Sequence, residues 1–579
     1  MKRIVPWVAA GALGVLSIAV MHRGVILSGF RSLPGDQLDA RWIVAIIEHW
    51  YRFYLGQQRW LTVPYFHPVA NTLGYSDSLF LYSIPYTPLR LAGADPFRAF
   101  QIVLMFWSAI GFSGMLLLCR RGLSMPVAFS AVGAAIFTLS NGQFLHVGHS
   151  QNFGVMLAPW EAFLLLDYWR LPDKLSRRGW FSGMALAVLV PLHLYTSYYF
   201  GWAFIFFACL GAALVLAQNV RISGHRAVLE ALGHAWVSQR RQWLSFGIVA
   251  AVFLAPFFAT YVPVLLEMPA RSYAEVRSML PEPVDLINVS TGNLVWGRLL
   301  TSVLAPLRSR AMSWELNYGF PPLLLLLFVM STAAFMRKGS ASGLPRATAA
   351  NRSGLGLSSK QWIFLFGGIV LLGWLLLLKV GENSLWWLVY QLVPGAKALR
   401  AVSRLQLVLL IPMIAVVMLG LARAWDWARR ERGWHPGALS VALAFILAFL
   451  LVEQLNGRHN LHWDRVAQLD YLARVQPVPP DCRAFFLAPS SDRVAGTPFQ
   501  MHYRALQFQT EAMQLANHAG IPTFHGYGGF FPRDYSLLDP EHPDYLVRVN
   551  SWLRLNVIRE GVCSYNPLDG SWTPYQPPG

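Results

Sequence analysis

Long apolar stretches alternate with short polar connections along most of the chain. A helix needs about 20 mostly apolar residues to cross a bilayer. One apolar stretch, 180–217, is interrupted by HLYTSYYFG, which predicts two helices joined by a tight turn at Tyr195–Gly201. The pattern predicts an all-α polytopic membrane protein with spans at 5–27, 98–119, 125–143, 153–169, 180–197, 199–217, 243–264, 319–336, 362–380, 404–422 and 438–456.

The pattern changes in the last part of the chain. Helix-like segments (WDRVAQLDYLARV, RALQFQTEAMQLANHAG and PDYLVRVNSWLRLN) alternate there with strand-like CRAFFLAP and GVCSY. Such alternation is typical of a small α/β domain. We therefore expect two domains, a transmembrane domain over 1–456 and an α/β domain over 457–579.

Composition supports a membrane protein. The 579 residues are 55% hydrophobic and 13% charged, whereas soluble proteins carry about 25% charged residues. The net charge of +18 comes from short clusters of Lys and Arg between apolar runs. Clusters in alternate connections follow the positive-inside rule rather than the basic face of a nucleic-acid-binding protein, so no nucleic-acid partner is expected.

The same rule predicts the topology. The N-terminus lies inside, and the first helix, which follows Met1-Lys2-Arg3 and has no small-residue cleavage site, is retained. The first loop (28–97), the loops near 265–318 and 381–403, and the tail then lie outside. The Gly- and Ser-rich stretch 337–361 is expected to be a flexible inside linker.

The candidate chemistry begins at GDQLDAR, residues 35–41, directly after the first span. A helix over 37–50 would bring Asp36, Asp39 and Arg41 within about one turn. Asp36 and Asp39 are the candidate catalytic carboxylates. The alternative is that they only cap this helix, because Asp is a favoured residue at a helix N-terminus.

Other outside polar residues have the right types for a site. A carboxylate base together with cations suits the transfer of a group from a phosphate-bearing donor. The candidates for binding the donor phosphate are Lys397, Arg400 and Arg404, predicted at the outer end of the tenth span, with snorkelling to the interface as the alternative. The candidates for contacting substrate are Arg41, Glu48, His67, His146, His149, Tyr195, His525 and Tyr527.

Three of these candidates, and two cysteines of the tail, have structural interpretations to consider. His146 and His149 have the spacing of metal ligands but no third partner, which favours hydrogen bonding. The aromatic stretch around Tyr195 is typical of an interfacial belt. Cys482 and Cys563 lie in the tail, where an oxidising compartment would allow a disulfide; two unrelated thiols are the alternative.

Four segments together resemble a known superfamily. They are GDQLDAR, YFHPVANTLGYSDSLF, PGAKALRAVSRLQLVLL and IPTFHGYGGFFP. With a retained first helix and a long first loop, they resemble the GT-C integral-membrane glycosyltransferases, which include oligosaccharyltransferase catalytic subunits and aminoarabinose transferases. The chain is most similar to an uncharacterised bacterial branch that ends in an NGYSG-like segment, here His525-Gly526-Tyr527-Gly528-Gly529.

The resemblance implies a function. It implies an enzyme of the bacterial inner membrane, with a periplasmic tail, that moves a sugar from a polyprenyl-phosphate donor to a glycan, lipid or protein acceptor. A first-loop Asp is the implied base, with Asp36 preferred to Asp39, and the late-loop cationic role falls on Arg400 and Arg404. No cofactor is expected, and no metal, because the spacing is DxxD rather than DxD.

Other classes of protein remain as alternatives. A polytopic transporter or lipid flippase would place ionisable residues inside the spans, where the sequence offers mainly His22, Arg23 and Glu453. A membrane acyltransferase would need a buried His-centred motif, for which His146 and His149 are the candidates. A scaffold that holds other proteins through its tail does not explain the charged first loop.

Overall fold

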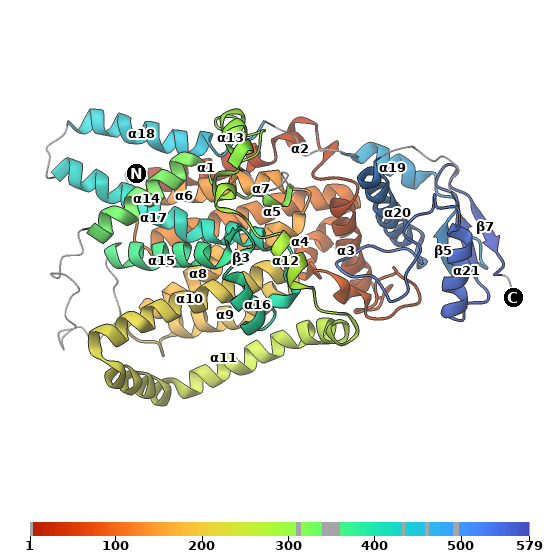
Figure 1. The fold of residues 1–579 in the computed structure, drawn as a ribbon, viewed down its shortest axis with the longest axis horizontal. Coiled ribbons are helices and arrows are strands. Elements are labelled where there is room, and N and C mark those ends of the chain that lie inside the picture. Colours follow the sequence, from red (N-terminus) through yellow and green to blue (C-terminus); the bar gives the residue numbers. More distant parts are fainter. Residues whose placement is uncertain are drawn as a thin grey trace.

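The computed structural model describes residues 4–307, 314–337, 359–430, 435–457, 463–489 and 497–577 (Figure 1). Most of the predicted linker 337–361 lies outside these residues. Seven helices of the described part are long and apolar enough to span a membrane: Pro96–Gly122, Val127–Leu145, Arg177–Thr196, Tyr198–Ser223, His225–Glu267, Lys360–Leu377 and Val402–Arg429. Each coincides with a predicted span, so the protein is a mostly helical, multi-pass membrane protein.

The other four predicted spans form shorter elements. Three are the apolar helices Val5–Met21, Pro322–Ala334 and Gly437–Val452. The fourth, 153–169, begins as the 3-10 helix Ser150–Leu157 and continues as a helix only from Ala158. The polar residues at its start contact other segments, since Asn152 donates a hydrogen bond to the Tyr318 hydroxyl at 3.1 Å. The span predicted over 153–169 therefore stays a prediction, because its α-helical part has only 13 residues.

The helices follow in chain order. They are α1 Val5–Met21, α2 Arg23–Leu27, α3 Asp39–Tyr54, α4 Phe80–Leu91, α5 Pro96–Leu117, α6 Val127–Thr138, α7 Asn141–Leu145, α8 Ala158–Arg170, α9 Arg177–Thr196, α10 Tyr198–Ser223, α11 His225–Glu267, α12 Tyr273–Ser278, α13 Gly297–Leu304, α14 Pro322–Arg337, α15 Ser359–Leu377, α16 Trp386–Leu392, α17 Gln406–Arg430, α18 Pro436–Val452, α19 Arg465–Ala473, α20 Pro498–Ala519 and α21 Tyr545–Leu555. The predicted turn within 180–217 falls at Ser197, between α9 and α10.

The strands are short. They are β1 Ser32–Leu33, β2 Lys379–Val380, β3 Asn383–Ser384, β4 Trp463–Asp464, β5 Ala484–Leu487, β6 Val562–Tyr565 and β7 Trp572–Tyr575. In the tail, β5 pairs in parallel with β6, and β6 pairs antiparallel with β7. β1 pairs with β4 and so ties the start of the tail to the residues before GDQLDAR.

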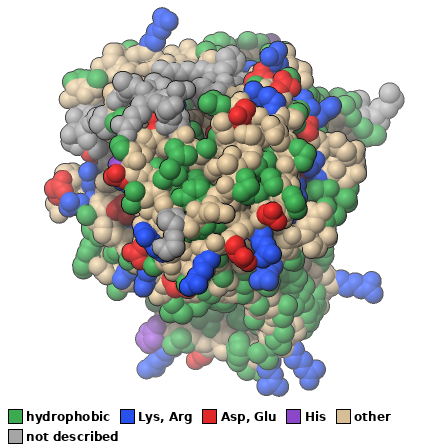
Figure 2. All heavy atoms as spheres, turned by 90° about the vertical axis from the view of Figure 1, so that its right-hand side faces the viewer, with side chains coloured by type: hydrophobic (Ala, Val, Ile, Leu, Met, Phe, Trp, Pro, Cys, Tyr) green, Lys and Arg blue, Asp and Glu red, His purple; other side chains and the backbone are tan. Residues whose placement is uncertain are grey.

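The two ends of the molecule differ. α3 and the tail elements α19, α20 and α21 lie at the right of Figure 1, and the junction of α10 with α11 lies at the left. Seen from the tail end, acidic and basic side chains are scattered among hydrophobic ones (Figure 2). The tail packs on the first loop, because Asn517 of α20 donates a hydrogen bond to the carbonyl of Ala45 in α3 at 2.9 Å.

A close approach of two glycines places the first loop. Gly35 has φ +85°, and a Cβ on it would lie 2.7 Å from the Cα of Gly148. Two side chains would not fit between these backbones. The start of GDQLDAR is therefore held directly against the segment that carries His146 and His149.

A Gly35→Ala variant is expected to lower the apparent Tm more than Gly29→Ala does. Both glycines have positive φ, at +85° and +62°, so both variants bear the cost of about 1–2 kcal/mol for a left-handed residue with a Cβ. A Cβ on Gly29 meets nothing within 4 Å, whereas one on Gly35 meets Gly148. Thermal unfolding in detergent measures the difference, and equal shifts would contradict the contact.

Candidate functional site

The first carboxylate of GDQLDAR stands at the start of α3. Asp36 Oδ1 accepts hydrogen bonds from the backbone N–H groups of Leu38 at 3.1 Å and Asp39 at 2.9 Å. These N–H groups have no partner within the helix, so the carboxylate satisfies them and its charge suits the helix N-terminus. The capping role expected as an alternative is present, and it also holds the Asp36 carboxylate rigidly.

The second carboxylate opens a chain of buried charges. Asp39 Oδ2 lies 2.9 Å from His149 Nδ1, and His149 Nε2 lies 3.2 Å from Glu315 Oε1. Arg404 donates two hydrogen bonds to Glu315, from its terminal nitrogen at 2.8 Å and from Nε at 3.2 Å. We call Asp39, His149, Glu315 and Arg404 the charge network; it joins four segments that are far apart in sequence.

Burial and mutual pairing set the protonation of this network. Burial alone would lower the pKa of His149, but the neighbouring Asp39 and Glu315 carboxylates raise it to about 9. Burial would likewise raise the pKa of Asp39 and of Glu315, yet the adjacent cations hold both below their ordinary values. At neutral pH the network therefore carries two positive and two negative charges.

The tail contributes a hydroxyl to each carboxylate. Tyr503 of α20 donates to Asp36 Oδ2 at 2.8 Å, and Tyr527 donates to Asp39 Oδ1 at 3.0 Å. Hydrogen bonds to a charged acceptor are stronger than neutral ones. The site is thus closed by the tail, which lies more than four hundred residues further along the chain.

Aromatic rings line the network. The His146 ring stacks on Tyr318 with 3.8 Å between centroids, and burial holds the pKa of His146 well below its ordinary value. His146 is therefore neutral where His149 is charged. The Arg404 guanidinium lies 5.5 Å from the centre of the Tyr199 ring.

The late-loop cations take different positions. Arg404 lies in the 3-10 turn Val402–Leu405, directly before α17 begins at Gln406, and Arg400 precedes this turn. Arg404 is buried in the charge network, whereas the Arg400 side chain is exposed. The backbone N–H of Arg400 donates to the Tyr199 hydroxyl at 2.7 Å. Lys397 is exposed, 5.6 Å from the centre of the Tyr390 ring.

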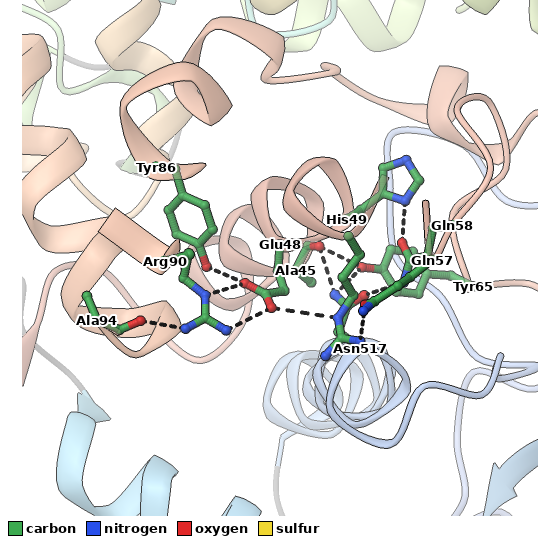
Figure 3. A network of polar contacts seen from close by, with 11 residues as sticks. Ala45, Glu48, His49, Gln57, Gln58, Tyr65, Tyr86, Arg90, Ala94 and Asn517 are labelled. Atoms are coloured by element: carbon green, nitrogen blue, oxygen red, sulfur yellow. Dashed lines mark hydrogen bonds and ion pairs between the residues drawn. The ribbon is translucent and has the colours of Figure 1, made fainter. Parts of the chain in front are cut away.

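Glu48 takes part in a separate network, shown in Figure 3. Its carboxylate accepts hydrogen bonds from Tyr86 at 2.7 Å and from Arg90 at 2.9 and 3.1 Å. In the same view Asn517 and Tyr65 donate to the carbonyl of Ala45. These contacts fix α3 against α4 and the tail, and they satisfy Glu48 without the charge network.

Four further candidates for contacting substrate are engaged elsewhere. Arg41 is buried and donates to Gln468 at 3.3 Å. Tyr195 is buried, and its hydroxyl accepts from Trp60 at 3.0 Å. The centre of the His67 ring lies 5.9 Å from that of the Phe524 ring, and the backbone N–H of His67 donates to the carbonyl of Thr523. His525 is buried beside β5, and burial lowers its pKa to about 3. For these four, the structure favours structural roles over contact with a substrate.

Sequence reasoning left out two residues of the site. Glu315 stands in a polar stretch between apolar helices, but nothing in its local sequence indicates that it pairs with His149 and Arg404. Tyr503 lies in an ordinary amphipathic helix, and nothing in its local sequence singles it out.

Among the described residues, no group of three or more His, Cys, Asp or Glu side chains is arranged to hold a metal ion.

A disulfide crosses the tail. It joins Cys482 to Cys563, the pair considered from the sequence. Cys563 lies in β6, and Cys482 lies just before β5, so the bond fastens the parallel pair of strands at one end.

Three solved structures are similar to this chain at low sequence identity. AglB, an archaeal oligosaccharyltransferase from Archaeoglobus fulgidus, in complex with an inhibitory peptide and a dolichol-phosphate, matches 91% of this chain and 65% of its own at 11% identity and TM-score 0.45. The arabinofuranosyltransferase AftD from Mycobacteria matches 86% of this chain and 31% of its own at 16% identity and TM-score 0.44. ArnT from Cupriavidus metallidurans bound to undecaprenyl phosphate matches 90% and 85% at 13% identity and TM-score 0.35.

The chain spans less than two thirds of the AglB structure and about a third of AftD. No protein-family model matches the chain, and no curated protein matches its sequence. The function is therefore argued below from the residues of this chain.

Proposed function

We propose that the protein is a membrane glycosyltransferase that moves a sugar from a polyprenyl-phosphate donor to an acceptor hydroxyl on the extracytoplasmic side. The observation that carries the proposal is the Asp36–Asp39 pair, held at the start of α3 beside the buried cations His149 and Arg404. Fixed charges of both signs beside the reacting groups stabilise a transition state in which charge separates.

Asp36 is the proposed base. Both oxygens of Asp39 are occupied, by His149 and by Tyr527, and its charge is balanced within the network. Asp36 Oδ1 is fixed by backbone N–H groups, while Oδ2 accepts from the Tyr503 hydroxyl. A hydroxyl of the acceptor can replace the Tyr503 hydroxyl at this oxygen. Asp36 Oδ2 is then placed to receive the proton of the acceptor hydroxyl.

The proposed step is a single displacement with inversion. The acceptor oxygen forms a bond to the anomeric carbon as its proton passes to Asp36 Oδ2. The bond from that carbon to the phosphate oxygen breaks, and its electron pair leaves with the polyprenyl phosphate. The exposed Arg400 is the proposed partner of this phosphate, since Arg404 already pairs with Glu315.

A transfer assay tests the proposal. The full chain is reconstituted in vesicles with polyprenyl-phosphate-linked arabinofuranose, mannose or glucose in turn, each with glycan, lipid and peptide acceptors. Release of polyprenyl phosphate together with a glycosylated product of inverted configuration supports it. Movement of the lipid donor across the bilayer without release of polyprenyl phosphate would support the transporter or flippase alternative instead.

An Arg400→Gln variant is expected to lower kcat/KM for the donor by about 10–100-fold, because a hydrogen bond to a charged group contributes about 1.5–3 kcal/mol. The transfer assay at limiting donor measures this. Arg559→Gln, at an exposed arginine before β6, is the matched control and should leave kcat/KM unchanged. A similar loss in both variants would contradict a specific role for Arg400.

A further inference from the structure

The helix α11 is longer than a membrane requires. It has 43 residues, which at about 1.5 Å per residue extend to about 65 Å, whereas the hydrocarbon core is about 30 Å thick. The apolar residues that can cross the membrane lie in the second half of α11, where the sequence predicts the span 243–264. The first part, residues 225–241, therefore lies outside the hydrocarbon core, next to the end of α10.

Within the described chain, this first part has little protein cover: Val228, Ala235 and Gln239 are half-buried, and its other residues are exposed. The buried residues of α11 are Gln242, Thr260 and Val264, so burial begins only after residue 241. Gln242 donates to the carbonyl of Lys174 at 2.7 Å and fixes the helix to the connection between α8 and α9. In Figure 1 the beginning of α11 lies at the lower left, far from α3 and the C-terminal strands.

The uncovered part nevertheless carries an apolar stripe. Leu229, Leu232 and Trp236 recur at intervals of three and four residues and share one face of the helix. Their side chains are 64%, 51% and 50% exposed. Trp243 continues the stripe where the helix meets the Tyr168 hydroxyl at 3.2 Å. The stripe is thus continuous with the part of α11 that enters the membrane.

Positive charge accompanies the stripe. Arg226, Arg240 and Arg241 lie in this part of α11, and Arg221 lies in the last turn of α10. All four are exposed, and the structure shows no ion pair for them within the described residues. Glu230 is the one acidic residue between positions 221 and 242. A basic helix with Leu and Trp on one face has the composition of helices that lie in a membrane interface.

We propose that residues 225–241 form an interfacial helix that binds the surface of the same bilayer that the protein spans, and that its arginines select anionic phospholipid headgroups. The apolar stripe enters the boundary between headgroups and acyl chains, and the arginines contact lipid phosphates. The proposal is independent of the glycosyltransferase function, because it concerns the end of the molecule away from the charge network.

Site-directed spin labelling of the full chain in vesicles tests the proposal. Leu232→Cys is labelled in a Cys209→Ser background, since Cys119 is buried and Cys482 is bonded to Cys563. The expected result in phosphatidylglycerol-containing vesicles is a collision rate with oxygen several-fold higher than with a water-soluble nickel chelate. His234→Cys, two residues on and on the opposite face, is the matched control and should give the reverse ratio.

Changing the lipid composition tests the selection of anionic headgroups by the arginines separately from the insertion of the apolar stripe. In pure phosphatidylcholine the Leu232 label should become several-fold more accessible to the nickel chelate. Replacing Arg226, Arg240 and Arg241 together with Gln should abolish this difference between lipids; these exposed positions leave the size-exclusion profile unchanged. Equal accessibility of the Leu232 and His234 labels would overturn the interfacial helix. Loss of the Leu232 shielding in nanodiscs that hold one copy would show that a second copy covers the stripe, which would also overturn it.

Discussion

An Asp36→Asn variant is expected to lose sugar transfer by about 10²–10⁴-fold, the range that a general base contributes. Asn retains a carbonyl oxygen that can accept from the N–H groups of Leu38 and Asp39, the two bonds that Asp36 makes at the start of α3. The substitution therefore removes the basic group with little change to the helix cap. Initial rates of product formation at saturating donor measure the loss.

The controls separate catalysis from folding. The apparent Tm of Asp36→Asn should stay close to that of the wild type, because the cap persists. Tyr503→Phe removes the hydroxyl that donates to Asp36 Oδ2 but leaves the carboxylate, so its rate should fall far less. Full transfer by Asp36→Asn would refute Asp36 as the base. A loss of rate matched by a large loss of Tm would assign it a structural role instead.

The stability of the fold is expected to depend on pH through His149. The pKa of His149 is about 9 in the fold, against 6.5 for an ordinary histidine. Since the folded value is the higher one, the stabilisation by charged His149 is complete below pH 6.5 and is lost as the pH rises through 9. This loss is on the order of 3 kcal/mol, because each pKa unit corresponds to about 1.4 kcal/mol. Apparent Tm measured from pH 6 to 10 should fall across this window.

Replacing His149 should remove both the stability and the pH dependence. His149→Gln leaves Asp39 and Glu315 without the cation between them, and breaking a buried ion pair typically costs about 3–5 kcal/mol. His146→Gln is the matched control three residues away: His146 is neutral in the fold, so this variant should keep the fall in Tm between pH 6.5 and 9. If His149→Gln kept that fall as well, the charged state of His149 would be wrong.

Much of the membrane part was predictable because it depends on local properties of the chain. Seven predicted spans are long apolar helices, and the turn between α9 and α10 falls where HLYTSYYFG interrupts the apolar run. The transfer of apolar residues into a bilayer is a sum over neighbouring residues. Local hydropathy did not predict that the segment before Ala158, where Asn152 donates a hydrogen bond to Tyr318, is a 3-10 helix.

The sequence by itself determined which segments are apolar, that a helix begins in GDQLDAR within two residues of its predicted start at 37, and that Asp36 and Asp39 stand together at this start. Only the tertiary structure decided that Asp39 pairs with His149, that Glu315 links His149 to Arg404, and that Tyr503 and Tyr527 reach the two carboxylates. The physical reason is one of distance. Hydropathy and helix caps depend on residues a few positions apart, whereas ion pairs and hydrogen bonds require contact within about 3 Å. For loops hundreds of residues apart, that contact is set by the packing of the whole bundle and tail.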